Sequence, residues 1–318
     1  MDCTLLALNG CPLSSVSGPM EILSLANSLV DRDKRMNIRI VSESSSQVDC
    51  LGGVKLTAHS SINEVAKTDL LIIGAIGNPG LHPIAYKSAT LSWIKQHYAQ
   101  GAQVVSICTG AFLLAETGLL DGKKATTHWA VESLFRKRFP QVLLQSEHII
   151  TQDGNLCCSG GASAYQDMSL FIVRQHFGQQ AAHQCAKNVL IDPSRYSQRP
   201  FASFKTCRQH QDNLIHTLQD WIQENASEAF SIASLAEKVS LSERQLKRRF
   251  KQATNETPLA YIQALRIESA KHNLETSNLQ IEQISRLSSY EDVRFFRKLF
   301  KRYTSLSPSE YREKFRLS

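Results

Sequence analysis

Short, continuous apolar runs alternate with amphipathic stretches along the first two hundred residues. The apolar runs are five to seven residues long and cover 3–9, 37–41, 69–74 and 103–108. Helical spacing of apolar residues marks two of the intervening stretches, 18–30 and 91–98. Strands that are buried on both faces have such continuous apolar sequences, and the helices between them cover the sheet. The pattern therefore predicts an α/β domain with a parallel sheet between layers of helices.

The last hundred residues carry one pattern twice, about 50 positions apart. In each copy a short helix precedes a tight turn and a second helix whose apolar positions face inward and whose outward positions are basic. Seven positions of the first copy have a residue of the same kind 50 positions later: Arg244, Lys247, Arg248, Phe250, Lys251, Pro258 and Tyr261 correspond to Arg294, Arg297, Lys298, Phe300, Lys301, Pro308 and Tyr311. A duplicated helix–turn–helix with a basic second helix is the arrangement that reads DNA.

Composition and charge narrow the function classes. The chain has 318 residues, more than the roughly 100–150 of a typical domain, so we expect two domains. Apolar residues make up 42% and charged residues 20%, ordinary globular values that exclude wholesale disorder. The net charge is +7, and the clusters 244–251 and 294–302 contain no acidic residue. A lone basic amphipathic helix is usually a solvated face, but two copies at a fixed offset favour phosphate contacts.

The sequence gives no sign of a membrane span, a secretory signal or a metal site. No apolar run approaches the roughly 20 residues that a membrane span needs, and the first residues lack the basic start of a secretory signal. We therefore expect a cytoplasmic, nucleoid-associated protein with no membrane contact, whose eight cysteines are reduced. The nearest metal-like spacings, His183-x-Cys185 and Cys207-x-x-His210, are isolated pairs, so we expect no metal and no other cofactor.

The segment from about 217 to 318 resembles the DNA-binding domain of the arabinose-regulator (AraC/XylS) family. The resemblance is carried by Leu241-Ser-Glu-Arg-Gln-Leu-Lys-Arg-Arg-Phe250, Thr257-Pro258 and Leu306-Ser-Pro308-Ser-Glu-Tyr311-Arg312. It implies that the start of each second helix enters the major groove. By position, the implied DNA-binding residues are Arg244, Gln245, Lys247 and Arg248, and then Arg294, Arg297 and Lys298. The family usually has Gly where Ser289 stands, so we expect the second turn to be differently posed.

A sharp junction follows the fourth apolar run. The predicted strand ends at Cys108 and a helix begins at once, with Gly110 two positions on. This is the pattern of a nucleophile elbow, which lifts the side chain above the sheet. Because a helix N-terminus favours thiolate, we expect a lowered pKa for the Cys108 thiol.

This junction and its surroundings resemble the PfpI-like, class I glutamine amidotransferase-like superfamily, and in particular the branch that is fused to an arabinose-regulator-type domain. Residues 108–129 carry that motif almost unbroken. The resemblance implies a small-metabolite pocket lined by Glu21, Gly74, Cys108, Thr109, His128 and Trp129. Two alternatives stay open, a live cysteine hydrolase or aldehyde-processing enzyme that uses Cys108 with His128 and Glu21, and an inert dimerisation scaffold. His128 and Trp129 also suit plain core packing.

The sequence thus predicts a flavodoxin-like parallel-sheet sandwich at 1–191, a linker at 192–216 and an all-α double helix-turn-helix domain at 217–318. We expect a sequence-specific transcriptional regulator without enzyme activity. Its expected partners are a double-stranded operator, a small-molecule effector, a second copy of the chain and RNA polymerase. The resemblance implies activation of a catabolic operon as the output.

Overall fold

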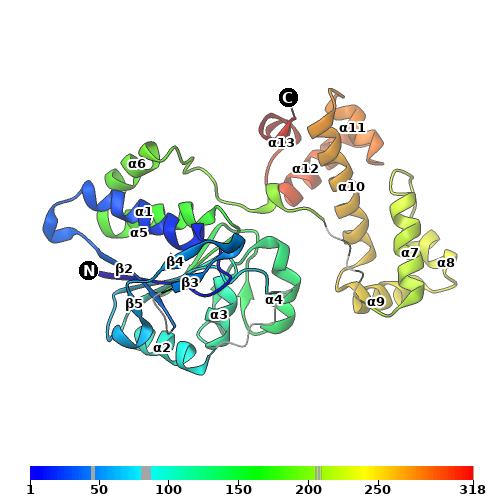
Figure 1. The fold of residues 1–318 in the computed structure, drawn as a ribbon. Helices are drawn as coiled ribbons and strands as arrows, with labels where there is room; N and C mark the ends of the chain where they lie inside the picture. The colour runs from blue at the N-terminus through cyan, green and yellow to red at the C-terminus, as the bar shows by residue number, and fades with distance from the viewer. Residues whose placement is uncertain (44–46, 80–86, 205, 207, 209, 318) are drawn as a thin grey trace. The chain divides into compact units, whose positions relative to one another are not determined.

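The computed structural model describes residues 1–43, 47–79, 87–204, 206, 208 and 210–317 (Figure 1). The chain divides into two compact units, Met1–Gln198 and Arg199–Ser318. Within the described ranges, no helix has both the length and the apolar character to cross a membrane.

The first unit is built on a seven-stranded sheet in the order β10-β11-β7-β6-β1-β2-β5. All pairs are parallel except β10–β11, which is antiparallel. Its strands are β1 (Asp2–Leu6), β2 (Asn37–Ser42), β5 (Ser60–Ser61), β6 (Leu70–Ile73), β7 (Gln103–Ile107), β10 (Ile150–Asp153) and β11 (Leu156–Ser159). Two small sheets pair β3 (Gln47–Asp49) with β4 (Lys55–Thr57), and β8 (Lys124–Ala125) with β9 (Leu143–Leu144).

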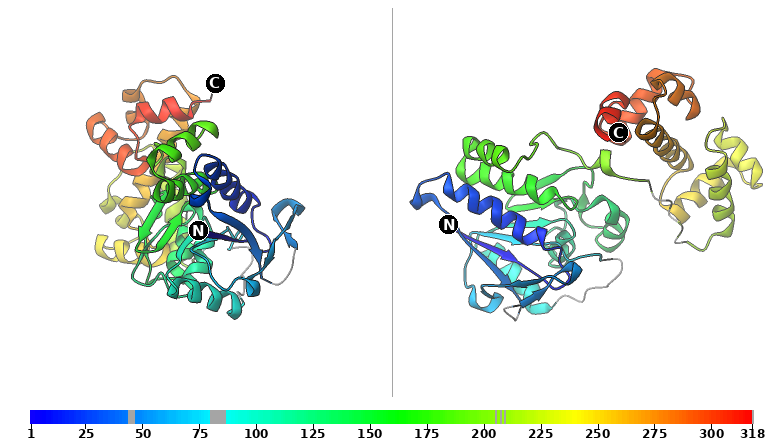
Figure 2. Two further views of the ribbon diagram at one scale, coloured as in Figure 1. Left: turned by 90° about the vertical axis from the view of Figure 1, so that its left-hand side faces the viewer. Right: turned by 45° about the horizontal axis from the view of Figure 1, so that its top comes forward.

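Helices cover both faces of this sheet, as Figure 2 shows. One layer contains α1 (Ser14–Ser28), α5 (Ala164–Phe177) and α6 (Gln179–Asn188), and the other α2 (Ser88–Ala99), α3 (Gly110–Glu116) and α4 (Glu132–Arg138). Successive strand residues point to opposite layers, so Leu5 packs in one core cluster and Leu6 in the other. The predicted α/β sandwich is confirmed.

The second unit is entirely helical in its described part. Its helices are α7 (Asn213–Glu224), α8 (Ile232–Lys238), α9 (Glu243–Thr254), α10 (Pro258–Thr276), α11 (Ile281–Leu287), α12 (Val293–Thr304) and α13 (Pro308–Phe315). They form two small cores, one around Phe250 and one around Phe300. The long helix α10 contributes to both cores, through Tyr261 to the first and Ile267 to the second.

The two helix-turn-helix copies also repeat in their turns. Ser240 before α9 has a φ of 52° and Ser289 before α12 a φ of 60°, both in the left-handed region. The expectation of a differently posed second turn is therefore wrong, because Ser289 adopts the backbone conformation that glycine would supply. The ends of the second helices match as well, with a φ of 62° at both Asn255 and Ser305.

The first unit extends to Gln198, seven residues past the predicted boundary at 191. Gln198 is 4% exposed, and its side-chain amide lies among backbone groups from three segments. Its Nε2 donates to the carbonyl oxygens of Ser146 (2.8 Å) and Thr127 (2.9 Å), and its Oε1 accepts from the Gly161 N–H (2.7 Å). Buried polar groups are held where their hydrogen bonds are satisfied, so this segment belongs to the first unit.

The second unit begins at Arg199, well before the predicted 217. The Arg199 guanidinium donates to the carbonyl oxygen of Arg302 on α12 (2.8 Å). The Phe201 ring packs edge-on against Phe315, with centroids 5.3 Å apart. Lys271 on α10 is 5% exposed, and its Nζ donates to the carbonyl oxygen of Ala202 (2.6 Å). Residues 199–202 are thus packed parts of the second unit.

Candidate effector pocket and nucleic-acid interface

Cys108 occupies the predicted elbow between β7 and α3. Its φ is 54°, a strained value for a residue other than glycine, and α3 begins two residues later at Gly110. A Cβ at Gly110 would lie 2.6 Å from the carbonyl oxygen of Gly74 and 2.8 Å from that of Ile73. The turn is therefore tight enough to demand glycine there, and the predicted conformation is confirmed.

The environment of the Cys108 thiol differs from the prediction. Burial raises the pKa of the Cys108 thiol to about 11, although hydrogen bonds from the Thr109 N–H and hydroxyl act in the opposite direction. The side chain is 7% exposed, and the cost of burying a thiolate outweighs the pull of the helix N-terminus. The expected lowering of the pKa is wrong, and the thiol is protonated at neutral pH.

Two backbone N–H groups in the loop after β6 are engaged by side chains. The Ala75 N–H donates to Ser15 Oγ (3.0 Å), and the Ile76 N–H donates to Thr109 Oγ1 (3.1 Å). Ser15 in turn donates to the carbonyl oxygen of Pro12 (2.7 Å). An oxyanion hole needs unengaged N–H groups aimed at the developing charge, and neither of these two is unengaged.

Ser15 is a residue near the elbow that sequence reasoning missed, and Glu21 lies six residues further along the same helix. Both lie on α1, but Ser15 is buried against Gly74 and Ala75 while Glu21 is exposed. Six residues along a helix correspond to about 9 Å of axial rise. Glu21 makes no hydrogen bond or ion pair with any other described residue, Cys108 included.

The loop that carries His128 and Trp129 does reach the elbow. The hydroxyl of Thr127, the preceding residue, donates to the carbonyl oxygen of Cys108 (2.9 Å). His128 Nδ1 accepts from the Ala130 N–H (3.0 Å), which leaves Nε2 as the protonated nitrogen of a neutral ring. His128 and Trp129 are both half-buried, with ring centroids 5.4 Å apart. The loop is thus joined to the elbow through Thr127.

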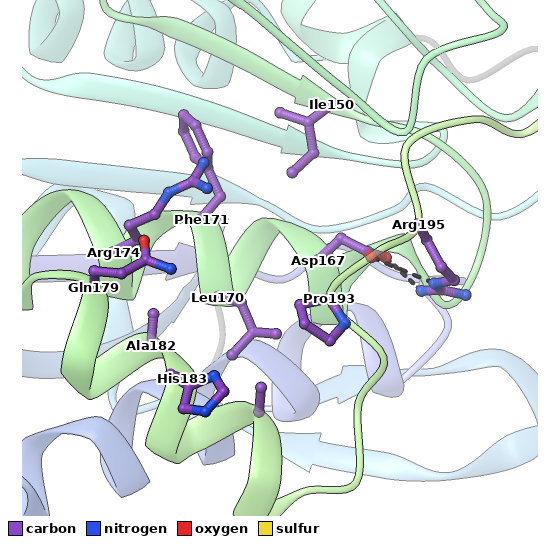
Figure 3. A pocket seen from close by; sticks show the side chains of 11 residues that line it. Ile150, Asp167, Leu170, Phe171, Arg174, Gln179, Ala182, His183, Pro193 and Arg195 are labelled. Atoms are coloured by element: carbon purple, nitrogen blue, oxygen red, sulfur yellow. Dashed lines mark hydrogen bonds and ion pairs between the residues drawn. The ribbon is translucent and has the colours of Figure 1, made fainter.

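A separate cavity of about 200 Å³ lies between α5, α6 and residues 193–195 (Figure 3). At one end Arg195 pairs with Asp167, and at another Arg174 lies beside the Phe171 ring. Burial raises the pKa of Asp167, and the Arg195 guanidinium opposes that shift. None of the six predicted effector residues lines this cavity.

The second helices of the two helix-turn-helix copies, α9 and α12, present the predicted cations to solvent. Arg244, Arg248, Arg294 and Lys298 are exposed, and their side chains form no hydrogen bond or ion pair with other described residues. The remaining two cations are partly neutralised by neighbours. Lys247 Nζ lies 2.8 Å from Glu243 Oε2, and an Arg297 nitrogen lies 2.9 Å from Glu282 Oε1.

Two other polar residues of α9 have local structural roles. Gln245 Oε1 accepts from both the N–H and the hydroxyl of Ser242, the N-cap of the helix (both 2.9 Å). Arg249 donates twice to the Asp212 carboxylate (2.6 and 3.0 Å), which holds the pKa of Asp212 below its usual range. Asp212 also caps α7, so Arg249 joins α9 to α7 although it belongs to the basic cluster in the sequence.

No group of three or more potential metal-ligating side chains is found among the described residues. The seven described cysteines are free, whereas Cys207, half of one metal-like pair, lies outside the described residues.

Comparison with known proteins assigns the two units. Residues 7–175 match the DJ-1/PfpI family model, and residues 235–314 match a helix-turn-helix domain model. The chain is 26% identical to the HTH-type transcriptional regulator CdhR of Pseudomonas aeruginosa over 276 residues, 86% of this chain and 80% of that protein. It is 29% identical to an isonitrile hydratase of Pseudomonas putida over 164 residues, 51% of this chain and 66% of the hydratase.

Among solved structures, a transcriptional regulator protein from Vibrio parahaemolyticus is similar over 59% of this chain and 98% of its own, with a TM-score of 0.55 and 27% identity. Drosophila melanogaster DJ-1beta shares the fold over 60% of this chain and 98% of its own, with a TM-score of 0.52 and 17% identity.

Proposed function

Because the chain belongs to the DJ-1/PfpI family and is an AraC-type DNA-binding transcriptional regulator, we propose that a small metabolite bound near Cys108 controls its occupancy of a promoter operator. The second unit reads the operator through α9 and α12, one helix in each of two successive major-groove segments. A second copy of the chain binds the adjacent half-site, and RNA polymerase is contacted from there.

The observation that carries this proposal is that four basic side chains are exposed and unpaired in the described part of the chain. Arg244 and Arg248 on α9, and Arg294 and Lys298 on α12, are exposed near the start of their helices and have no partner among the described residues. Exposed cations of this kind release counterions when they meet phosphate, and arginine also grips guanine O6 and N7. Lys247, Arg297 and Gln245 complete the proposed interface in a supporting role, since each already has an intramolecular bond.

A binding experiment on the full chain tests the DNA half of the proposal. A high-affinity duplex is first selected from a random library, and Arg244→Ala and Arg294→Ala are then compared with wild type by fluorescence anisotropy. We expect each change to relax the preference at one or two base pairs and to weaken binding by about 5- to 150-fold, the equivalent of about 1–3 kcal/mol. Arg32→Ala, an exposed change in the first unit, is the matched control and leaves affinity unchanged.

Equal weakening on selected and random duplexes would assign Arg244 and Arg294 to phosphate contacts and would refute the base-reading roles. Failure of the wild-type chain to select any sequence would refute sequence-specific recognition.

The effector half is supported by the close approach of Gly74 to the elbow, by the bond from Thr127 to the Cys108 carbonyl oxygen and by a thiol that burial keeps protonated; Thr109, His128 and Trp129 are its proposed further lining. A regulator needs its ligand to favour one state over another, not to be converted. A thermal-shift screen of the full chain against amino acids, betaines, polyamines and small aldehydes tests this proposal. A ligand at about 100 times its dissociation constant stabilises by about 2.7 kcal/mol. The shift should be reduced in Thr109→Val and retained in Glu21→Gln; a shift that survives both changes would place the ligand elsewhere.

One observation favours the enzyme alternative, namely the strained elbow conformation at Cys108. That reading predicts a turnover that Cys108→Ser abolishes while DNA affinity stays unchanged. The high thiol pKa and the engaged N–H groups of Ala75 and Ile76 argue for binding over turnover. An inert dimerisation scaffold, the third reading, predicts no thermal shift with any compound in the screen.

A further inference from the structure

The start of α12 carries a large apolar side chain among its cations. Phe295 is 46% exposed, next to the unpaired Arg294. Lys298 lies three residues on, which in a helix is the same face. The ring of Phe295 therefore stands within the surface that the proposed function turns toward the major groove.

The cap of α12 does not involve the side chain at this position. In the first copy the equivalent residue is Gln245, whose side chain completes the N-cap of α9. In the second copy Asp292 alone caps the helix, and its carboxylate accepts from the N–H groups of Arg294 (2.8 Å) and Phe295 (3.1 Å). The side chain at 295 is thus released from capping and is available for contact with a partner.

The Phe295 ring also packs against a buried aromatic side chain. Its centroid is 5.8 Å from that of Tyr290, which is 9% exposed and packs in turn against Phe296 at 5.9 Å. The Tyr290 ring is itself covered by the Arg266 guanidinium, which lies 5.6 Å from the ring centroid. An apolar group supported by a buried aromatic loses little side-chain entropy on binding.

We propose that Phe295 reads a thymine in the operator by packing against its C5-methyl group. This inference rests on the proposed DNA-binding function of α12. Thymine alone among the four bases presents a methyl group in the major groove, and phenylalanine is one of the side chains that contact it. The two helices then differ in their reading chemistry. Helix α9 offers guanidinium groups for guanine, whereas α12 combines its cations with one apolar contact.

Replacement of thymine by uracil tests the contact directly, because uracil lacks only the methyl group. On the duplex selected by the wild-type full chain, each thymine is changed singly to uracil, and affinities are measured for wild type and for Phe295→Ala. We expect one substitution to weaken wild-type binding about fourfold, which corresponds to the roughly 0.8 kcal/mol of burying one methyl-sized group. The same substitution should leave the affinity of Phe295→Ala unchanged.

Two control variants separate this contact from general effects. Phe295→Leu keeps an apolar side chain and retains part of the uracil effect. Leu259→Ala removes another exposed apolar side chain (54% exposed), at the start of α10, and keeps the full effect.

The inference is overturned if no uracil substitution weakens the wild type more than Phe295→Ala. It is also overturned if Phe295→Ala selects the same sequence as wild type with the same thymine preference. Either result leaves the proposed function intact, provided that Arg244→Ala and Arg294→Ala still relax base preference. If the wild-type chain selects no sequence at all, the proposed function fails and this inference fails with it.

Discussion

The thiol of Cys108 should alkylate far more slowly than an ordinary cysteine, and its rate should keep rising to high pH. Burial raises the pKa from its ordinary value of 9.0 to about 11. Deprotonation creates the charge that burial disfavours, so the protonated form persists two pH units further than in an exposed thiol. Because only the thiolate reacts, the reactive population at neutral pH is about one hundredth of that of an exposed cysteine.

Peptide-resolved mass spectrometry after iodoacetamide treatment measures this rate for Cys108 alone. With glutathione as the reference thiol, we expect a rate at pH 7.5 that is at least about a hundredfold lower. It should increase about tenfold per pH unit without levelling off below pH 10. Cys3, fully buried with a pKa raised to about 12, is the internal comparison and should react more slowly still.

A plateau between pH 6 and 8, or a rate at pH 7.5 equal to that of glutathione, would refute the reasoning. Either result would mean that the helix N-terminus at Thr109 and Gly110 outweighs burial, and it would move the first unit toward the enzyme reading.

Three further predictions concern stability and are measured by urea unfolding. Ser240→Gly should stabilise the second unit by about 0.5–1 kcal/mol, because glycine adopts the left-handed conformation of Ser240 without the steric cost that serine has there. The greater chain entropy of glycine in the unfolded state offsets only part of this gain. A loss of stability would contradict the claim that Ser240 is strained. Gln198→Leu should destabilise the first unit by about 1–3 kcal/mol, since the backbone groups around the amide lose their partner; an unchanged midpoint would contradict it. Lys271→Met should destabilise the second unit by a similar amount, and adding Glu268→Gln should recover part of the loss if the Lys271–Glu268 pair is the cause.

Much of the fold follows from local pattern. The apolar runs, the duplicated basic helices and the elbow at Cys108 each depend on a few neighbouring residues, and each is present in the structure. The order of the strands and the position of Ser15 depend on contacts between distant segments. Ser15 and Gly74 are 59 residues apart, and no spacing rule joins them. Glu21 was predicted at the site from its place in the motif, and in the structure it is exposed on α1 without an ion pair to a described residue.

Tertiary structure sets electrostatic balances that the local sequence does not show. A helix start favours the Cys108 thiolate locally, yet burial by the surrounding layers dominates its pKa. Arg249 belongs to a cationic cluster in the sequence, but Asp212, 37 residues earlier, neutralises it. Which cations face solvent unpaired therefore becomes visible only when the helices are packed.

The hydrogen bonds of Gln198 determine where this chain can be cut for study. A fragment that ends at 191, the boundary suggested by the sequence, would lack the amide that fills the space beside Thr127 and Gly161. It would expose the carbonyl oxygen of Ser146 and the N–H of Gly161 to an empty site and would lose stability for reasons unrelated to any ligand. A fragment that ends at Gln198 keeps these bonds, and one that begins at Arg199 keeps the Arg302 contact. Isolated-domain measurements on this protein should use the peptide bond between Gln198 and Arg199 as the dividing point.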